Sequence, residues 1–382
     1  MYDLLMPIRF IVRFIKKALS SALRLIPYGD LILIIKRRLV TSEPKIAIVV
    51  IYQYHAEYLS SLVRSDPQFV FRHSRYRYYD CDKRMPKFEW SDPGTLDVVL
   101  TDNTDFLREG FTKQHRLLLR MQHSPGFGLW VPLYLYEKIK SYHGKLMIPI
   151  YVWNLAMKCR CLDEQTEKMR ALILKDKMPL LFTHYDPKMN AIFNCPRTIN
   201  RREGTALVAL NWRMREKKCD IKLVIKAIDF LRRGLKVKVL YHPIIRSNDF
   251  RNRKPLLLLN EYLDKHNIES QMGISPIKEL VNLYDEYDFI LTDGSGSVYE
   301  AIVRGCKALT LEGLTYQRDR NVLRPTVEMG LLPKTSVWDY QGHPGIEQDL
   351  NFVKTYYGSH SLTGEDVTPF IRQEIIDAFK NW

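Results

Sequence analysis

The side chains that could do chemistry in this sequence of 382 residues gather in short loops of small, polar and basic residues. The sharpest loop follows an apolar run that begins at Asp288, and it reads Asp293, Gly294, Ser295, Gly296, Ser297. Small residues let backbone N–H groups approach an anion, and a helix N-terminus adds positive potential. The loop therefore favours a phosphate or pyrophosphate, although it is neither a P-loop nor a G-x-G-x-x-G fingerprint.

The same residues are also consistent with a simpler role. Ser297 and Glu300 have the spacing of a capping box, in which each satisfies a backbone N–H at the start of a helix. A well-capped helix and a phosphate site are both compatible with this pattern, so both interpretations stay open.

A histidine at the mouth of a second loop could act on an acceptor. His123 follows the apolar run 116–121 and precedes Gly126 and Gly128, which would leave room for a substrate. Its unperturbed pKa lies near working pH, so the imidazole could serve as general base for a hydroxyl. A structural histidine in a turn explains the residue equally well.

Two further basic residues follow predicted strands in the second half of the chain. His242 comes directly after the run 235–241 and could donate to a phosphate or act as an acid. Arg213 follows the run 205–210, and its guanidinium could bind phosphate oxygens through two parallel hydrogen bonds. Each residue could instead belong to an ordinary loop.

The elements that must position these residues alternate between strands and helices. Continuous β-branched runs predict buried strands of a parallel sheet, and periodic segments between them predict helices. Strands are expected at 45–52, 96–101, 116–121, 147–152, 180–183 (weakly), 205–210, 235–241, 288–292 and 307–311, and helices at 219–233, 255–266, 276–284 and 297–304. The polar segment 196–204, with Pro and Gly at its ends, predicts the connection between two domains. Such folds bind ligands beyond the carboxyl ends of their strands, where all four loops fall.

The composition limits the classes of partner that the chain is expected to bind. The net charge is +15, which suits a phosphate-rich substrate, an anionic bilayer or nucleic acid. The six cysteines form no C-x-x-C pair, which disfavours a structural metal and favours a reducing compartment. Asp80-Cys81-Asp82 has the spelling of a metal-binding D-x-D motif, but no strand leads into it. We therefore expect neither a metal nor a cofactor.

The first forty residues form a segment of their own. They carry eight Lys and Arg residues against Asp3 and Asp30, with apolar residues between them at helical spacing. No apolar run approaches the ~20 residues that span a bilayer. The segment 1–40 is therefore expected to be an interfacial helix on an anionic membrane, at the cytoplasmic face of the plasma membrane. A helix packed on the protein's own core is the alternative.

Taken in order, the four loops resemble motifs of the CDP-glycerol glycerophosphotransferase family of teichoic-acid and capsule polymer synthesis. The resemblance covers roughly residues 116–315. The matching segments are Gln122-His123-Ser124-Pro125, Asn211-Trp212-Arg213, Tyr241-His242-Pro243 and Thr292-Asp293-Gly294-Ser295. Two departures stand out: Gly126 falls later than the family's glycine, and Asp293-Gly294-Ser295 replaces an Asp-Tyr-Ser form.

The resemblance implies an α/β fold of two Rossmann-like lobes, the GT-B type, behind the amphipathic helical segment. Residues 41–200 would form the acceptor-side lobe and residues 201–382 the lobe that binds a nucleotide donor. The implied enzyme transfers a glycerophosphate-type or glycosyl group from a CDP-linked or similar donor to a hydroxyl of a glycan or lipid-linked acceptor, without a metal ion. His123 would be the base, and His242, Ser295 and Arg213 would contact the donor phosphates.

Two alternatives remain. The glycine-rich loop also resembles nucleotide-sugar 2-epimerases and other GT-B glycosyltransferases, in which a Glu of the following helix can bind a ribose, as Glu300 could here. A basic nucleic-acid or membrane-binding module without catalysis is the alternative outside enzymes. The aromatic residues are not interleaved with Lys and Arg as in stacking platforms, so specific binding of nucleic acid is not expected.

Overall fold

The computed structural model describes the chain in segments. They are residues 46–50, 68–71, 98–101, 117–120, 145–149, 180–210, 220–242, 254–273, 277–292, 296–311, 333–357 and 361–380. The predictions for residues 1–40, His123, Arg213, Asp293, Gly294 and Ser295 lie outside these segments.

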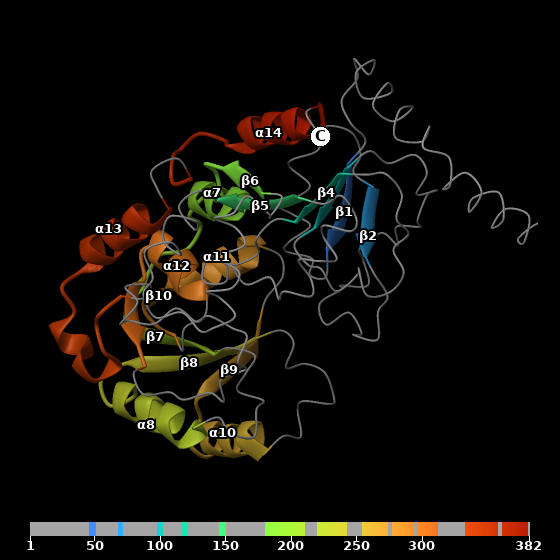
Figure 1. Ribbon diagram of the computed structural model, residues 1–382. Coiled ribbons are helices and arrows are strands. Elements are labelled where there is room, and N and C mark those ends of the chain that lie inside the picture. Colours follow the sequence, from blue (N-terminus) through green and yellow to red (C-terminus); the bar gives the residue numbers. More distant parts are fainter. Residues whose placement is uncertain are drawn as a thin grey trace, which may run out of the picture.

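The first lobe is built on a sheet of six parallel strands. The strands are β1 Ile46–Val50, β2 Gln68–Phe71, β3 Val98–Thr101, β4 Leu117–Arg120, β5 Lys145–Pro149 and β6 Leu180–Thr183. Their spatial order is β2-β1-β3-β4-β5-β6 (Figure 1). Five of them were predicted. Strand β2 was missed, and β5 begins at Lys145, two residues before its predicted start, while residues 150–152 of that prediction lie outside the described segments.

The second lobe alternates strands and helices around a second parallel sheet. Its elements are β7 Arg202–Leu210, α8 Ile221–Leu231, β8 Lys236–Tyr241, α10 Lys254–Lys265, β9 Glu269–Met272, α11 Ile277–Glu286, β10 Tyr287–Thr292, α12 Ser297–Val303 and β11 Lys307–Thr310. The strand order is β11-β10-β7-β8-β9. Every predicted strand and helix of this lobe is present, whereas β9 and the helices after residue 311 were missed.

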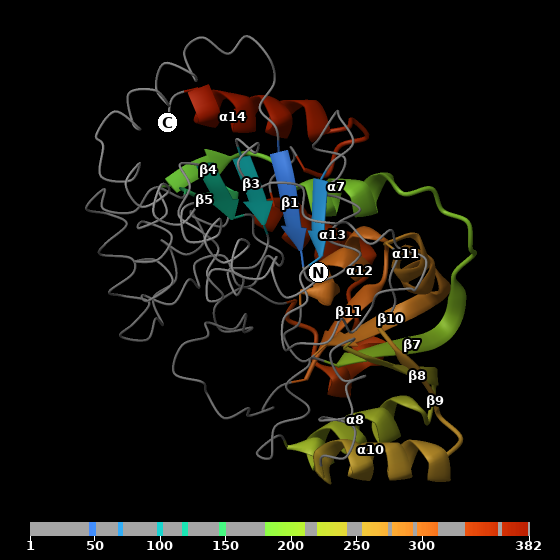
Figure 2. The same cartoon turned by 90° about the vertical axis from the view of Figure 1, so that its right-hand side faces the viewer.

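Both faces of the second sheet are covered, as continuous apolar strands require. Helices α8 and α10 pack together on one face, and α11 and α12 lie on the other (Figures 1 and 2). Alternate residues of β7, such as Ala206 and Val208, join Val224 of α8 and Leu259 of α10 in one fully buried cluster. Burying each large aliphatic side chain contributes about 1.5–3 kcal/mol, so this layer stabilises the lobe before any polar contact is counted.

The chain crosses between the lobes through α7 Pro187–Asn194 and the segment that follows it. Asp186 caps this helix, since its carboxylate accepts the Met189 N–H at 2.9 Å, and Pro187 occupies the first helical position. The predicted connection 196–204 is too long by three residues. Strand β7 already begins at Arg202, because Arg202 pairs with Tyr287 ahead of an irregularity in the ladder.

The C-terminal segment crosses back to the first lobe. Helix α13 Ile346–Tyr357 packs on α12 and β11, and α14 Thr368–Lys380 contacts β6 (Figure 2). Between them, the side-chain amide of Asn190 in α7 donates to the Glu365 carbonyl at 2.9 Å and accepts the Val367 N–H at 3.3 Å. Helix α7, which forms part of the first crossing, is thus hydrogen-bonded to the second crossing as well.

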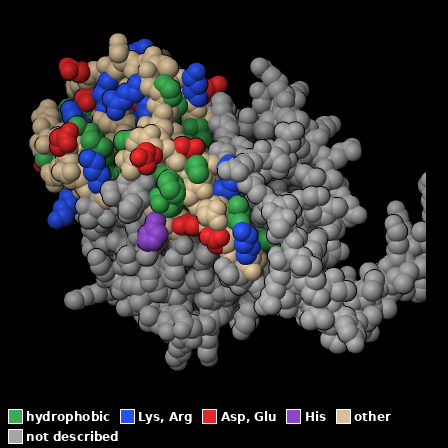
Figure 3. Space-filling view, turned by 90° about the horizontal axis from the view of Figure 1, so that it is seen from above, with side chains coloured by type: hydrophobic (Ala, Val, Ile, Leu, Met, Phe, Trp, Pro, Cys, Tyr) green, Lys and Arg blue, Asp and Glu red, His purple; other side chains and the backbone are tan. Residues whose placement is uncertain are grey.

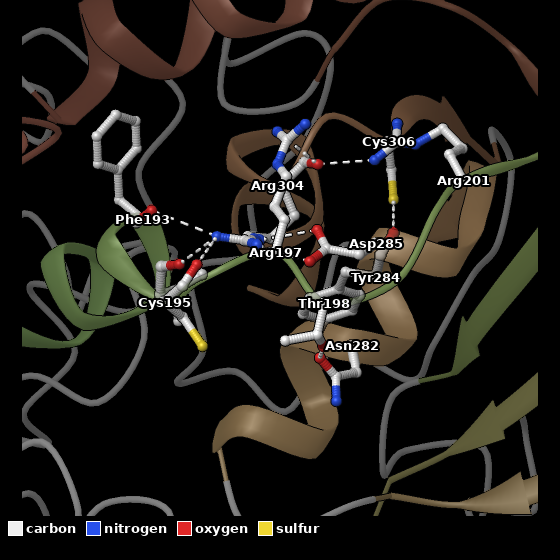
Figure 4. A network of polar contacts seen from close by, with 11 residues as sticks. Phe193, Cys195, Arg197, Thr198, Arg201, Asn282, Tyr284, Asp285, Arg304 and Cys306 are labelled. Atoms are coloured by element: carbon white, nitrogen blue, oxygen red, sulfur yellow. Dashed lines mark hydrogen bonds and ion pairs between the residues drawn. The ribbon is translucent and has the colours of Figure 1, made fainter.

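A fully buried arginine joins α7 to the second lobe (Figure 4). Arg304 donates to Asp285 of α11 through Nε at 2.9 Å and Nη2 at 2.6 Å. Its Nη1 donates to three carbonyls at the end of α7, those of Ile192, Phe193 and Cys195, at 3.0, 3.3 and 2.7 Å. A cation at a helix C-terminus meets the negative end of the helix dipole, so this one side chain satisfies both an acid and a helix end.

The backbone around Arg304 is fixed as tightly as its side chain. The Arg304 carbonyl accepts hydrogen bonds from Arg201 at 2.7 Å and Arg197 at 3.2 Å. Gly305 then ends α12 with φ of +95°, and a Cβ there would lie 3.1 Å from the Arg201 guanidinium. Glycine is required by both the left-handed backbone and this close approach.

Removing one partner of this buried pair should leave a charge without compensation. We expect Arg304→Met to lower the free energy of unfolding by about 3–5 kcal/mol in urea titrations, with partial recovery in the double variant Arg304→Met/Asp285→Leu. Arg202→Ala is the matched control, since the Arg202 side chain of β7 is 62% exposed and pairs with Glu286, the neighbour of Asp285 in α11. It should cost about 0–1 kcal/mol. Equal losses in Arg304→Met and Arg202→Ala would show that the buried contacts of Arg304 do not stabilise the fold.

Candidate functional site

The strand order of the second sheet creates a switch point at its centre. Strand β7 lies in the middle, the chain adds β8 and β9 on one side, and it then adds β10 and β11 on the other. In open parallel sheets, ligands bind outside the carboxyl ends of the strands at such a point. The carboxyl ends of β10, β7 and β8 are therefore neighbours, and the segments that follow them are those singled out from the sequence.

Of those segments, the one after β8 is described as far as His242. This residue is half-buried and directly follows Tyr241, whose phenol donates to Asn260 of α10 at 2.7 Å. Burial raises the pKa of Tyr241 far above its usual range, with a smaller contribution from Asp264. The Tyr241 carbonyl accepts the Gly273 N–H at 2.6 Å. His242 therefore directly follows a strand end that is held in place through both the side chain and the carbonyl group of Tyr241.

The loop after β10 is described from Gly296 onward. Strand β10 ends at the buried Thr292, and α12 begins at Ser297 with Gly296 as its N-cap. No side chain caps the helix, so the predicted capping box between Ser297 and Glu300 is wrong. The physical reason lies in Glu300, whose carboxylate is directed to other partners.

Glu300 is a buried carboxylate with one donor on each oxygen. Lys188 of α7 forms an ion pair with its Oε1, and Tyr284 of α11 donates to its Oε2 at 3.1 Å. All three side chains are buried, with Glu300 only 4% exposed. Burial, followed by the charge of Glu300, raises the pKa of Tyr284 well above its usual value, so the phenol stays protonated and donates.

The Glu300 carboxylate can accept further hydrogen bonds. Each carboxylate oxygen has two lone pairs, so one donor per oxygen leaves room for further hydroxyl donors. A ribose hydroxyl is a ligand that this chemistry suits. Lys188, by contrast, was not anticipated from the sequence. Its only signal is the Asp186-Pro187 pair before it, which marks a helix start but gives no indication of a partner in the other lobe.

In the first lobe the structure describes the strand that leads to His123. Strand β4 ends at Arg120 and lies between β3 and β5, one strand away from the switch point between β1 and β3. The segment after β4 thus starts at the carboxyl edge of this sheet, as the apolar run 116–121 predicts.

Two kinds of feature are absent from the described residues. Within the described segments, no three His, Cys, Asp or Glu side chains are grouped so that they could hold a metal ion. Among the helices of the same segments, none has the length and apolar character needed to cross a bilayer.

No family model and no curated protein matches the sequence. Solved structures are similar in fold. MnaA of S. aureus, solved as a co-structure with UDP, gives a TM-score of 0.50 at 13% identity over 88% of this chain and 96% of that one.

Two other structures are similar over most of their length. The wall teichoic acid polymerase TagF gives a TM-score of 0.49 at 10% identity over 98% of both chains. A UDP-N-acetylglucosamine 2-epimerase gives 0.45 at 14% identity over 90% of this chain and 98% of that one. At such identities a similarity shows the fold alone, and the fold of this chain is the predicted α/β arrangement of two Rossmann-like lobes, the GT-B type.

Proposed function

We propose that the chain is a transferase of the CDP-glycerol glycerophosphotransferase type. It would move a glycerophosphate-type or glycosyl group from a nucleotide-diphosphate donor to a hydroxyl of a cell-surface glycan or lipid-linked acceptor. The observation that carries the proposal is the parallel order β11-β10-β7-β8-β9, in which Arg213, His242 and the 293–297 loop follow three adjacent strands. A protein of similar fold solved with UDP supports the nucleotide part of the donor.

The chemistry assigns one role to each lobe. His123 accepts the proton of the acceptor hydroxyl, and the oxygen attacks the donor phosphorus that carries glycerol. The bond from that phosphorus to the bridging oxygen breaks, and a nucleoside monophosphate leaves. With a sugar donor the attack falls on C1 and a nucleoside diphosphate leaves. In both cases Arg213, His242 and the backbone of residues 293–297 stabilise charge on the leaving phosphate.

Glu300 gives the donor site its second half. Its buried carboxylate lies on the first turn of α12, just beyond the phosphate-binding loop in our proposal. We propose that its remaining lone pairs accept the ribose hydroxyls, while Lys188 and Tyr284 hold the carboxylate in place.

The transfer reaction is tested by the products of a donor panel. The protein is incubated with CDP-glycerol, CDP-ribitol and UDP-sugars, with and without membranes, and with a chelator in parallel. We expect release of CMP from an alditol donor and no effect of the chelator. His123→Ala should lower turnover by about 10²–10⁴-fold at unchanged donor affinity. His242→Ala and Ser295→Ala should instead weaken donor binding.

Other products would support other reactions. Conversion of a UDP-sugar to its C2 epimer, with no nucleotide released, would replace the transferase proposal by the epimerase alternative. Salt-dependent binding of DNA without affinity for any nucleotide would support the module without catalysis. Equal activity of His123→Ala and the parent would remove His123 from the mechanism.

The role of Glu300 is tested by changing the ligand as well as the protein. A nucleotide that lacks the ribose hydroxyls is compared with one that carries them. We expect Glu300→Gln to bind CDP about tenfold or more weakly, because hydrogen bonds to a charged group are lost. The parent and Glu300→Gln should bind 2′,3′-dideoxy-CDP with similar affinity, measured by calorimetry. Lys188→Met is the matched control for damage to the buried pair, since it keeps the carboxylate. The same loss with both nucleotides would assign Glu300 a structural role only.

The membrane prediction for residues 1–40 calls for a separate experiment. We propose that this segment holds the protein on the cytoplasmic face of the plasma membrane through anionic head groups. A variant that lacks residues 1–40 should shift from the membrane to the soluble fraction and lose binding to vesicles that contain anionic lipid. Vesicles of neutral lipid serve as the control. An unchanged distribution between the fractions would argue against the interfacial helix.

A further inference from the structure

Two arginines converge on one backbone carbonyl where the first crossing between the lobes runs past the end of α12. Arg201 donates from Nη2 to the Arg304 carbonyl at 2.7 Å, and Arg197 donates from its own Nη2 to the same oxygen at 3.2 Å (Figure 4). We call Arg197 and Arg201 the crossing arginines. Because both Nη2 atoms contact one oxygen, two positive charges lie side by side at this point.

Neither guanidinium has an acidic partner among the described residues. Within those segments, each donates to the Arg304 carbonyl and to no other group. The dipole of α12 places only about half a negative charge at this helix end, against two full positive charges. A guanidinium carries five N–H donors, so the crossing arginines keep both net charge and donors for a ligand.

The acidic side chains around the end of α12 have partners of their own. Burial raises the pKa of the Cys306 thiol, and the charged side chains that also act on it are the crossing arginines, Asp285 and Asp288. Asp285 pairs with Arg304 at 2.6 Å, and Asp288 pairs with Lys307 at 3.3 Å. These two carboxylates therefore do not neutralise the crossing arginines.

Two arginines at the end of α8 show how this chain compensates such a pair elsewhere. Arg232 and Arg233 donate to the two carboxylate oxygens of Asp229, at 2.8 and 3.1 Å. Hydrogen bonds from these arginines lower the pKa of Asp229 to about 2, so the carboxylate is charged at neutral pH. On the face shown in Figure 3, Lys and Arg side chains likewise lie among Asp and Glu side chains. At the end of α12, a neutral carbonyl takes the place of the carboxylate.

The crossing arginines are held in place by the fold. Thr198, which lies between them in the sequence, donates to Asn282 of α11 at 2.7 Å (Figure 4). A Cβ at Gly305 would meet Nη2, Nη1 and Cζ of Arg201 at 3.1, 3.2 and 3.4 Å, so the face of this guanidinium lies on the glycine. All N–H groups lie in the guanidinium plane, and this contact therefore leaves the donors at its edge available. Arg201 is partly exposed and Arg197 is exposed.

We propose that the crossing arginines bind a phosphate group. The tetrahedral oxygens of phosphate accept from two guanidinium forks at once, whereas the two oxygens of a carboxylate are matched by one fork. The site lies at the carboxyl end of α12, while the proposed donor loop precedes its amino end, so this phosphate is not that of the donor. Free phosphate, a glycerol phosphate chain and an anionic lipid head group share the required chemistry. The binding goes beyond the proposed transfer and does not depend on it.

The inference is tested by titrating the full-length protein with inorganic phosphate at constant ionic strength, with and without saturating CDP to fill the proposed donor site. We expect saturable binding by calorimetry and a rise in Tm, because a ligand that binds the folded state stabilises it. Arg197→Gln and Arg201→Gln should each bind phosphate about tenfold more weakly, since each removes hydrogen bonds between charged groups. Arg233→Gln, which removes the same charge from a side chain that is 73% exposed, is the matched control and should bind like the parent.

Two further ligands distinguish the sources of phosphate. A glycerol phosphate trimer and vesicles of phosphatidylglycerol, with neutral vesicles as the control, are tested against the parent and the double variant Arg197→Gln/Arg201→Gln. A trimer that binds the parent more tightly than free phosphate would identify a phosphodiester chain. Vesicle binding that weakens in the double variant would identify a head group. Both results depend on the crossing arginines and would support the inference.

Three results would overturn the inference. They are a parent without saturable binding of phosphate, a double variant that binds phosphate like the parent, and acetate bound as tightly as phosphate. Arg201→Lys keeps the charge without the fork and should bind more weakly than the parent, so equal binding would also argue against the site. The Tm of each variant without phosphate separates loss of the site from loss of the fold. All variants should bind CDP like the parent, and phosphate binding without any transfer would leave this site standing while the transferase proposal fails.

Discussion

The arrangement of the two lobes depends on the need of buried charges for partners. Arg304 and Lys188 are both buried. Lys188 pairs with Glu300 across the junction between the lobes, whereas Arg304 pairs with Asp285 of its own lobe and donates across the junction to carbonyls at the end of α7. Arg304 extends from α12 to the end of α7, and Lys188 extends from the first turn of α7 to Glu300 of α12. An isolated buried charge costs several kcal/mol, so the Lys188–Glu300 pair strongly disfavours any arrangement that separates α7 from α12, and the hydrogen bonds from Arg304 to the α7 carbonyls act in the same direction. The second crossing reinforces this through Asn190.

This constraint acts at the edges where chemistry is expected. Helix α7 follows β6 at the carboxyl end of the first sheet, and α12 follows β10 at the carboxyl end of the second. Fixing these two helices against each other therefore sets the carboxyl edges of the two sheets at one junction. Local signals also define the bounds of these helices: Asp186 caps the start of α7, and Gly305 ends α12. The local and long-range signals agree, as they do in sequences that specify one structure.

The sequence predicted the parts of the fold that arise from local patterns. Buried parallel strands such as β8 and β10 contain apolar runs, so their positions were evident. The loops that follow these strands could then be placed at the strand ends. The edge strand β9, Glu-Ser-Gln-Met, is polar and largely unburied and therefore gave no signal. The site was predictable only as far as the strand ends. The ion pair between Lys188 and Glu300 joins residues distant in the chain, and it replaced the capping box that the spacing of Ser297 and Glu300 had suggested.

The short stretch of chain between the end of β6 and the Lys188–Glu300 pair gives helix α7 a further role. Strand β6 ends at Thr183, and Lys188 pairs with Glu300 only five residues later. Five residues span at most about 18 Å, so a shift at the end of β6 also acts on the ion pair. The turn that Asp186 caps and Pro187 starts lies between the two and resists such a shift. Helix α7 therefore holds the carboxyl edge of the first sheet at a fixed distance from Glu300, and in the transfer that we propose a fixed distance of this kind would orient the acceptor toward the donor.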